Sequence, residues 1–517
     1  MSRRFTSTIA GASFLITFIG ILGRGFGFLR EIIYADSFGL EKEFDIYLVG
    51  VVLPITINSA VFFLAQNYII PAYQKLKIES LENADSFLIK TIVLFFSFSV
   101  ILTIILLLFA SQVIGSIVNL NDDKFFEIAL DVYFWSCLTI PFNAVFSVLS
   151  AYKQSHFDFR STTISTLFPN FVIIASVLLF SKYIGVLSIP IGYFIGVLLQ
   201  VVYLSVLTWS DLQKTWKKNT AVNLTTGMLS KTFFFIVIIE TLNQLYVFID
   251  RYFWSDVEVG GIAALNYATT LFSLPISIFS FALSTAIFPV FSELVGKKDY
   301  KMLNGHLNLS LKMIFMVFIP CAFLFICYGG SIIELIFQRG KFDSIGTELT
   351  TRVLIIYAFS LVFYSCYGII NKLVFSLELI KELLVSIVII FTVKIVLNAY
   401  LVKIYQQDGL AIATSICYTL MFLFGYLIIN KVIKLKGKGE LLFSFLFYVV
   451  LNSLLFIIVQ VLLMAFDKTT LLLNITGVVI HLVLFLLSLI IINPDEFKTM
   501  TGKFNFIYTM ISKKSER

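Results

Sequence analysis

The stretch TIVLFFSFSVILTIILLLFA, residues 91–110, contains no charged side chain. It is long enough to cross the hydrocarbon core of a membrane, which takes about 20 mostly apolar residues. Much of the chain is similar, because 59% of its 517 residues are hydrophobic and only 13% are charged. A soluble domain carries about 25% charged residues. The apolar residues also run unbroken instead of alternating, as they would in a membrane barrel. We therefore expect an all-α polytopic membrane protein and exclude disordered and nucleic-acid-binding classes.

About fourteen apolar segments of spanning length follow one another along the chain. They begin near Ile9, Phe44, Phe87, Ala129, Thr162, Ile184, Thr232, Gly261, Leu309, Arg352, Glu382, Gly409, Leu441 and Leu471. Lysine and arginine are roughly threefold enriched in alternate loops, which predicts that both termini are cytoplasmic. We expect two pseudo-symmetric six-helix lobes, two extra helices and a tail, at residues 1–210, 211–435, 436–495 and 496–517.

Two stretches resemble each other and indicate an internal repeat. They read FLREIIYADSFGLEKEFDIYLVGVVLPI and FIDRYFWSDVEVGGIAALNYATTLFSLPI. Arg30 precedes Pro54 by the same distance as Arg251 precedes Pro275, and each proline stands in a Leu-Pro-Ile sequence. We expect both prolines to break their helices and to act as hinges, since proline lacks the backbone N–H. Parallel repeats of this kind are typical of transporters, in which the substrate binds between the repeats.

Charged side chains within the spans are the candidates for substrate binding, because charge at bilayer depth is costly and usually faces a cavity or a partner. Arg24 and Arg30 lie on one helix, about 120° apart around its axis. The arginine guanidinium binds phosphate through a planar fork of donors and stays protonated. We therefore expect a phosphate-bearing substrate at a site formed by Arg24, Arg30, Asp45 and Arg251. For Arg30, snorkelling to the outer headgroups is an equally good interpretation.

Other functional classes find less support in the sequence. It contains no phosphate-binding G-x-x-x-x-G-K-[ST] motif and no recognisable catalytic constellation outside the spans. Its three histidines and five cysteines lack metal-ligand spacing. We expect neither an enzyme nor a metal site nor a nucleic-acid partner. A membrane glycan polymerase, which needs a large outer loop, and a multidrug exporter, which favours buried carboxylates, remain as alternatives. The last two helices carry no distinctive motif.

The chain resembles the MurJ (MviN) group of lipid-linked glycan flippases, within the multidrug/oligosaccharidyl-lipid/polysaccharide exporter superfamily. The similarity extends from Gly23 to about Lys431. It rests on six phrases in the same order, GRGFGFLRE, FDIYLVGVVLPI, NQLYVFIDR, ALNYATTLFSLPISIFSFALSTAIFPVFSE, LIFQRGKF and DGLAIATSI. In this resemblance, Arg24 and Arg30 match cavity arginines of the family, and Asp45 matches the acidic residue of the second helix.

The resemblance implies a two-lobed, fourteen-helix fold that works by alternating access in the bacterial plasma membrane. The implied cargo is an undecaprenyl-diphosphate-linked saccharide such as lipid II, flipped from the cytoplasmic to the outer leaflet. The implied partners are this lipid, the bilayer and the glycan-synthesis machinery. No cofactor is expected, and the implied energy sources are the membrane potential or a sodium or proton gradient.

The chain departs from the family where cations are expected in the cavity. Residues 58–67, NSAVFFLAQN, carry no charge, and Thr269 and Thr270 end a phrase that usually closes with arginine. A surface-polysaccharide or O-antigen repeat unit is therefore a rival cargo.

A second departure concerns the coupling ion. The resemblance implies an ion site at Asp250, Asn398 and Thr414, where this chain adds Lys394. We hypothesise that Lys394 replaces sodium as a tethered cation, paired with Asp250 or Glu240. The alternative is that Lys394 only reaches a water-filled cleft.

Overall fold

The computed structural model describes residues 9–116, 123–216, 241–242, 245–246, 248–253, 256–464 and 470–501. Regular structure in these ranges is entirely helical, which confirms the predicted all-α fold. Ten helical stretches of the described residues are long and apolar enough to cross a membrane. The chain is therefore a multi-pass membrane protein.

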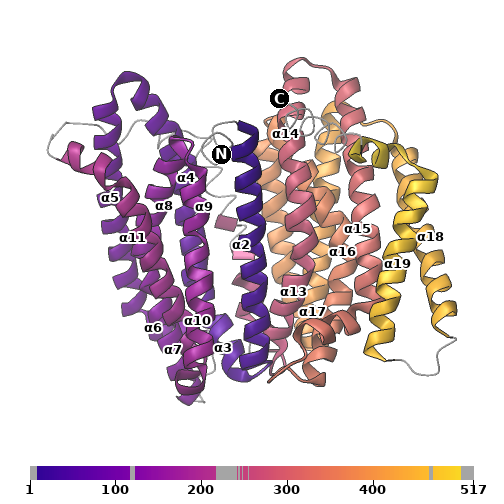
Figure 1. Cartoon of the computed structure of the whole chain (residues 1–517), viewed down its shortest axis with the longest axis horizontal. Coiled ribbons are helices and arrows are strands. Elements are labelled where there is room, and N and C mark those ends of the chain that lie inside the picture. Colours follow the sequence, from indigo (N-terminus) through magenta and orange to yellow (C-terminus); the bar gives the residue numbers. More distant parts are fainter. Residues whose placement is uncertain are drawn as a thin grey trace, which may run out of the picture. The chain divides into compact units, whose positions relative to one another are not determined.

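The first part of the chain supplies ten labelled α-helices (Figure 1). They are α2 (Ile9–Phe38), α3 (Lys42–Gly50), α4 (Val52–Glu79), α5 (Leu81–Leu108), α6 (Ala110–Gly115), α7 (Asp123–Cys137), α8 (Thr139–Ser155), α9 (Phe159–Ser165), α10 (Leu167–Ile184) and α11 (Ser188–Trp216). The second part supplies α13 (Gly261–Pro275), α14 (Phe281–Gly296), α15 (Tyr300–Phe337), α16 (Ser344–Ser376), α17 (Ile380–Ile433), α18 (Lys438–Leu463) and α19 (Leu471–Ile492).

Two helical stretches are too long for a single crossing. The 51 residues of Phe159–Trp209 are interrupted by a 3₁₀ turn at Gly185–Leu187. The 54 residues of α17 are interrupted at Gln406, which has φ 51° and ψ −130°. The two arms of α17 lie antiparallel, since Cys417 of the second arm approaches the Ile390 carbonyl of the first, with 3.8 Å from sulfur to oxygen. Each stretch therefore supplies two crossings.

These breaks bring the helices into agreement with the predicted spans. Each predicted span overlaps a described helix, apart from the one expected near Thr232, which lies outside the described residues. The total of fourteen spans stays a prediction.

Both Leu-Pro-Ile sequences coincide with an interruption of regular α-helix. Pro54 lies in the first turn of α4, where a proline costs no hydrogen bond, and the chain turns just before it at Val51. Pro275 ends α13 and is followed by a π-helix, Ile276–Ser280. Movement about these positions, the predicted hinge function, stays a prediction.

The chain divides into two compact units. Unit 1 comprises Met1–Ala264, Gln338–Gly346 and Asn398–Gln407, and unit 2 comprises Leu265–Phe337, Thr347–Leu397 and Asp408–Arg517. In unit 1, α8 packs against α4, α5 and α11, and α10 packs against α2 and α11. In unit 2, α15, α18 and α19 pack against one another, as Figure 1 shows on its yellow side. The division into lobes at residues 210, 435 and 495 stays a prediction.

Two turns of unit 1 meet through a pair of glycines. Gly39 and Gly340 both have φ +54°, and a Cβ on either one would overlap the backbone of the other turn, at Lys341 and Asp36 respectively. The Lys341 N–H donates to the Asp36 carbonyl at 3.0 Å, and the Lys341 ammonium pairs with Glu41 at 2.8 Å. Only glycine meets both the backbone conformation and the space available at these two positions.

We predict that Gly340→Ala lowers stability by about 1–3 kcal/mol, because it combines a strained φ with backbone overlap. The thermal unfolding midpoint of the purified protein in detergent measures the effect. Gly305→Ala is the matched control, since a Cβ there meets nothing within 4 Å. Equal midpoints for the two variants would contradict the steric argument.

Candidate functional site

Arg30 of α2 is held in a fixed position by two neighbouring side chains of unit 1. Its Nη2 lies 2.7 Å from Oε1 of Glu31, to which Nε also donates, and its Nη1 donates to Oδ1 of Asn170 on α10 at 3.0 Å. The guanidinium carbon lies 5.5 Å from the centre of the Tyr34 ring. Glu31 is buried, whereas the Arg30 side chain keeps 30% exposure. Arg30 is therefore a positioned cation with an accessible face.

Arg30 has more N–H donors than its two protein partners use. A guanidinium has five N–H groups. Three of them are used by Glu31 and Asn170, so two have no acceptor among the described residues. Two free donors on one planar cation suit a phosphate oxygen pair.

Further polar side chains from neighbouring helices connect to the surroundings of Arg30 through Tyr193. Asn143 of α8 donates to the Tyr193 hydroxyl of α11 at 3.3 Å, and Asn58 of α4 donates to Thr139 at 2.9 Å. Tyr193 also lies within electrostatic reach of Arg30 and close to Asn58. We call Arg30, Glu31, Asn58, Asn143, Asn170 and Tyr193 the Arg30 cluster.

The sequence analysis did not identify Asn58, Asn143, Asn170 or Tyr193. The signal that could have found them is an uncharged amide or phenol within an apolar span, where a polar group seeks a partner on another helix. Such residues occur in many spans, so only packing shows which of them meet.

The other two predicted arginines, Arg24 and Arg251, lie partly exposed on their helices. Arg24 is half-buried on α2, six residues before Arg30. Arg251 is half-buried, and its Nη1 donates to the Ile262 carbonyl at 3.2 Å. Their role as substrate contacts stays a prediction.

Asp45 occupies the N-terminus of α13. It is 1% exposed, and its two carboxylate oxygens accept hydrogen bonds from the backbone N–H groups of Gly260, at 2.6 Å, and Ala263, at 2.7 Å. The first N–H groups of a helix have no partner within the helix, and their dipoles attract a negative charge. Asp45 therefore caps a helix. Its predicted contact with substrate is not favoured by this geometry.

Two hydrogen bonds join predicted coupling-ion residues, one within each unit. In unit 1, Asn398 donates to Asp250 at 2.8 Å. In unit 2, the fully buried ammonium of Lys394 donates to the Thr414 hydroxyl at 3.1 Å. Glu240 lies outside the described residues.

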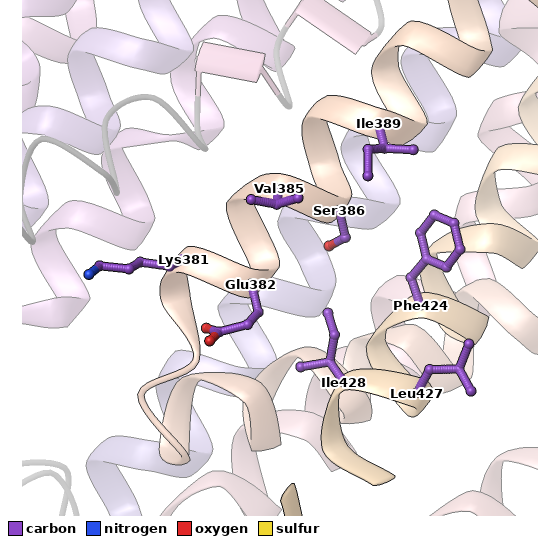
Figure 2. Close-up of a pocket in the computed structure, with 8 residues that line it drawn as sticks. All are labelled: Lys381, Glu382, Val385, Ser386, Ile389, Phe424, Leu427 and Ile428. Atoms are coloured by element: carbon purple, nitrogen blue, oxygen red, sulfur yellow. The ribbon is translucent and has the colours of Figure 1, made fainter. Parts of the chain in front are cut away.

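A groove of about 440 Å³ lies in unit 2 between the two arms of α17 (Figure 2). Ser386 and Ile389 line it from the first arm, and Phe424 and Leu427 from the second. The walls are mostly apolar, and the charged groups are confined to Lys381 and Glu382 at one end. The lining offers a single cation, Lys381, which is next to Glu382 in the chain, so the Arg30 cluster is the stronger candidate for binding an anion.

Comparison with known proteins identifies one family. The family model described as lipid II flippase MurJ matches residues 34–484. A protein of Borreliella burgdorferi named probable lipid II flippase MurJ is 25% identical over 437 residues, which cover 83% of this chain and 84% of the relative. The probable lipid II flippase MurJ of Aquifex aeolicus is 27% identical over 375 residues, which cover 71% and 72%.

Solved structures show the same fold. A structure titled lipid II flippase MurJ, inward closed conformation, matches with a TM-score of 0.77 and 23% identity, covering 92% of this chain and 98% of that one. An inward-facing multidrug-resistance MATE transporter of the MOP superfamily matches with a TM-score of 0.58 and 15% identity, covering 80% and 96%. The architecture is therefore common to flippases and drug exporters.

We predict that Asp45→Ala destabilises the protein by about 1–3 kcal/mol, because it leaves two buried N–H groups without an acceptor. Asp45→Asn retains one acceptor oxygen and should cost less. The unfolding midpoint in detergent measures both variants.

Asp256→Ala is the control, since Asp256 precedes the same helix but is exposed. If Asp45→Ala unfolds no earlier than Asp256→Ala, the capping role of Asp45 is wrong.

Proposed function

Because this chain belongs to the MurJ family of lipid II flippases, we propose that it translocates a polyprenyl-diphosphate-linked saccharide across the membrane by alternating access. Lipid II is the favoured cargo, since the curated relatives carry that name. The proposed direction is from the cytoplasmic to the outer leaflet of the bacterial plasma membrane, with both termini of the chain in the cytoplasm.

The observation that carries this proposal is the Arg30 cluster. A cation fixed by Glu31 and Asn170, with two free N–H groups, complements the diphosphate of a carrier lipid. The uncharged amides and phenol around it offer hydrogen bonds of the kind that sugar hydroxyls accept and donate. The isoprenoid tail stays in the bilayer, so only the polar head needs a path through the protein.

Energy for the transport does not require a nucleotide. With the inside of the cell negative, the membrane potential favours moving an anionic head group outward. The family description, lipid II flippase, names a translocation, and we propose that the chain is no enzyme.

A second cargo has a specific observation in its favour. Residues 58–67 lack charge, and Thr269 and Thr270 stand where the peptidoglycan flippases were expected to carry arginine. A surface-polysaccharide repeat on the same carrier lipid would use the same diphosphate site with different sugar contacts. Comparing transport of the two labelled lipids by the purified protein distinguishes these cargos.

A multidrug exporter would share the fold but not the charge of this site. Exporters of cations favour buried carboxylates. Here the buried carboxylate of Asp45 accepts hydrogen bonds at the N-terminus of α13. The Arg30 side chain, by contrast, keeps 30% exposure.

We predict that Arg30→Ala slows flipping of labelled lipid II in proteoliposomes by about tenfold or more, since a hydrogen bond to a charged group contributes about 1.5–3 kcal/mol. Arg30→Lys should keep part of the activity, because it retains the charge but not the fork of donors. Arg24→Ala should also lose activity, because Arg24 is a second arginine on the same helix, α2.

Arg160→Ala provides the control, because Arg160 is an exposed arginine of the same unit. Full activity in Arg30→Ala, with all variants equally folded, would rule out the proposed diphosphate site.

We also propose that Lys394 supplies the positive charge that a coupling sodium ion would otherwise provide. Its ammonium is fully buried and bonded to Thr414. Burying a lysine at this depth costs free energy unless neighbouring groups compensate for the charge. A lysine that is kept at such a position is therefore expected to have a function.

The prediction is that sodium, compared with potassium at equal ionic strength, does not shift the unfolding midpoint of the wild-type protein. Lys394→Ala should gain a sodium-dependent shift, because the emptied position can accept the ion. Lys403→Ala, at an exposed lysine of the same helix, should not. A sodium-dependent midpoint in the wild type would end this proposal.

A further inference from the structure

Helices α18 and α19 contain a buried polar cluster, although their sequences showed no distinctive motif. Tyr448 and Asn452 of α18 are 0% exposed, and His481 of α19 is 1% exposed. Glu496, which follows α19, is 6% exposed. Polar and ionisable side chains inside a membrane protein are rare, and they mark functional paths by default.

Hydrogen bonds connect these four residues in order. The Tyr448 hydroxyl donates to the Glu496 carboxylate at 2.7 Å, and the Asn452 amide donates to the Tyr448 carbonyl at 2.8 Å. The Asn452 oxygen lies 3.1 Å from Nε2 of His481. We call Glu496, Tyr448, Asn452 and His481 the His481 network. It extends from the end of α19 into the middle of the helix.

This network fixes the tautomer of His481. The Asn452 nitrogen is used as a donor, so its oxygen faces the histidine and accepts from Nε2–H. In a neutral imidazole the other nitrogen, Nδ1, then carries the lone pair. Nδ1 is buried and has no hydrogen-bond partner among the described residues. His481 therefore presents an unpartnered base to the protein interior.

The space next to His481 is shaped by a glycine. Gly477 lies one turn before His481 on the same face of α19, and its missing side chain admits the Tyr328 ring of α15. The Tyr328 ring centre lies 6.4 Å from that of His481. Among the described residues the Tyr328 hydroxyl has no partner with hydrogen-bond geometry, and Gln460 is a polar side chain close to it. A second unsatisfied polar atom thus lies beside the histidine.

We propose that His481 is an intramembrane proton-binding site, whose proton is taken up at Nδ1. The proton forms an N–H bond at Nδ1 and leaves from the same atom, so no other bond is made or broken. The resulting imidazolium needs an acceptor, because a buried charge without a hydrogen bond is costly. The Tyr328 hydroxyl oxygen on α15 is a candidate acceptor, since its ring centre lies 6.4 Å from that of His481.

The titratable groups on the packed elements suit this role. They are Tyr328 and its neighbour Cys327 on α15, Tyr448 on α18 and Glu496 after α19. Glu496 is the carboxylic acid among them, and histidine is the side chain whose ordinary pKa lies nearest neutral pH. Protonation of His481 therefore changes the charge of a three-helix contact and biases its packing.

A purely structural polar contact between helices is the competing interpretation. It predicts a histidine that stays neutral at every pH at which the protein is folded. Titration of His481 decides between the two.

The first experiment observes the imidazole directly. The chain has three histidines, so the variant His156→Gln/His306→Gln leaves His481 as the one ring signal while the network stays intact. With ¹³C-histidine labelling in detergent, we expect a reversible one-proton titration between about pH 5 and pH 9. Adding Glu496→Gln, which keeps an acceptor for Tyr448 but removes the charge, should shift the titration to lower pH. No titration in this range overturns the proposal.

The second experiment connects the proton to transport, and this part rests on the proposed flippase function. The flipping rate of the wild-type protein should change about threefold or more between pH 6 and pH 8. His481→Gln should abolish this dependence, whereas His306→Gln, on α15 of the same unit, should keep it. An unchanged pH profile in a folded His481→Gln overturns the coupling. If no variant flips lipid II, the proposed function fails, whereas the ring titration still tests the proton site.

Discussion

A polar group in hydrocarbon has no water to bond, so it must find its partner within the protein, and this constraint underlies the whole structure. It makes the described chain helical, because a helix satisfies its own backbone. At helix ends the backbone still needs acceptors, and Asp45 provides them for α13 with both carboxylate oxygens. The same constraint makes each other buried charge informative, because burying it costs free energy unless it has a partner or a function.

Arg30 and Asp45 illustrate how differently two intramembrane charges are used. Both were expected to contact substrate. The carboxylate of Asp45 is fully engaged by backbone donors, whereas three donors of Arg30 hold it in place and two stay open. This difference supports the anion-binding site that we propose at Arg30, and the membership of the MurJ family agrees with it. The fold alone does not make this distinction, since drug exporters share it.

Helices α18 and α19 obey the constraint in another way. Their outward faces are apolar, as expected of helices in contact with lipid, and their shared face buries the His481 network. Asn452 satisfies one ring nitrogen of His481 and leaves the other without a partner. The Arg30 cluster contains a cation that can bind an anion. The His481 network instead contains a ring nitrogen with a lone pair, so the ligand that we propose for it is a proton.

The sequence by itself determined the fold class, the positions of most spans and the family, because these depend on the length and order of apolar segments. The interruption at Pro275 agrees with the break expected there. Pro71, Pro289 and Pro320, however, lie inside described helices, so a proline by itself does not place a break. Only the tertiary structure decided which polar side chains meet. Asn170 lies 140 residues from Arg30, and Asn452 lies 29 residues from His481. Helical periodicity gives the face of a residue but not the helix it faces, so the contact of Asp45 with the N-terminus of α13 came from packing alone.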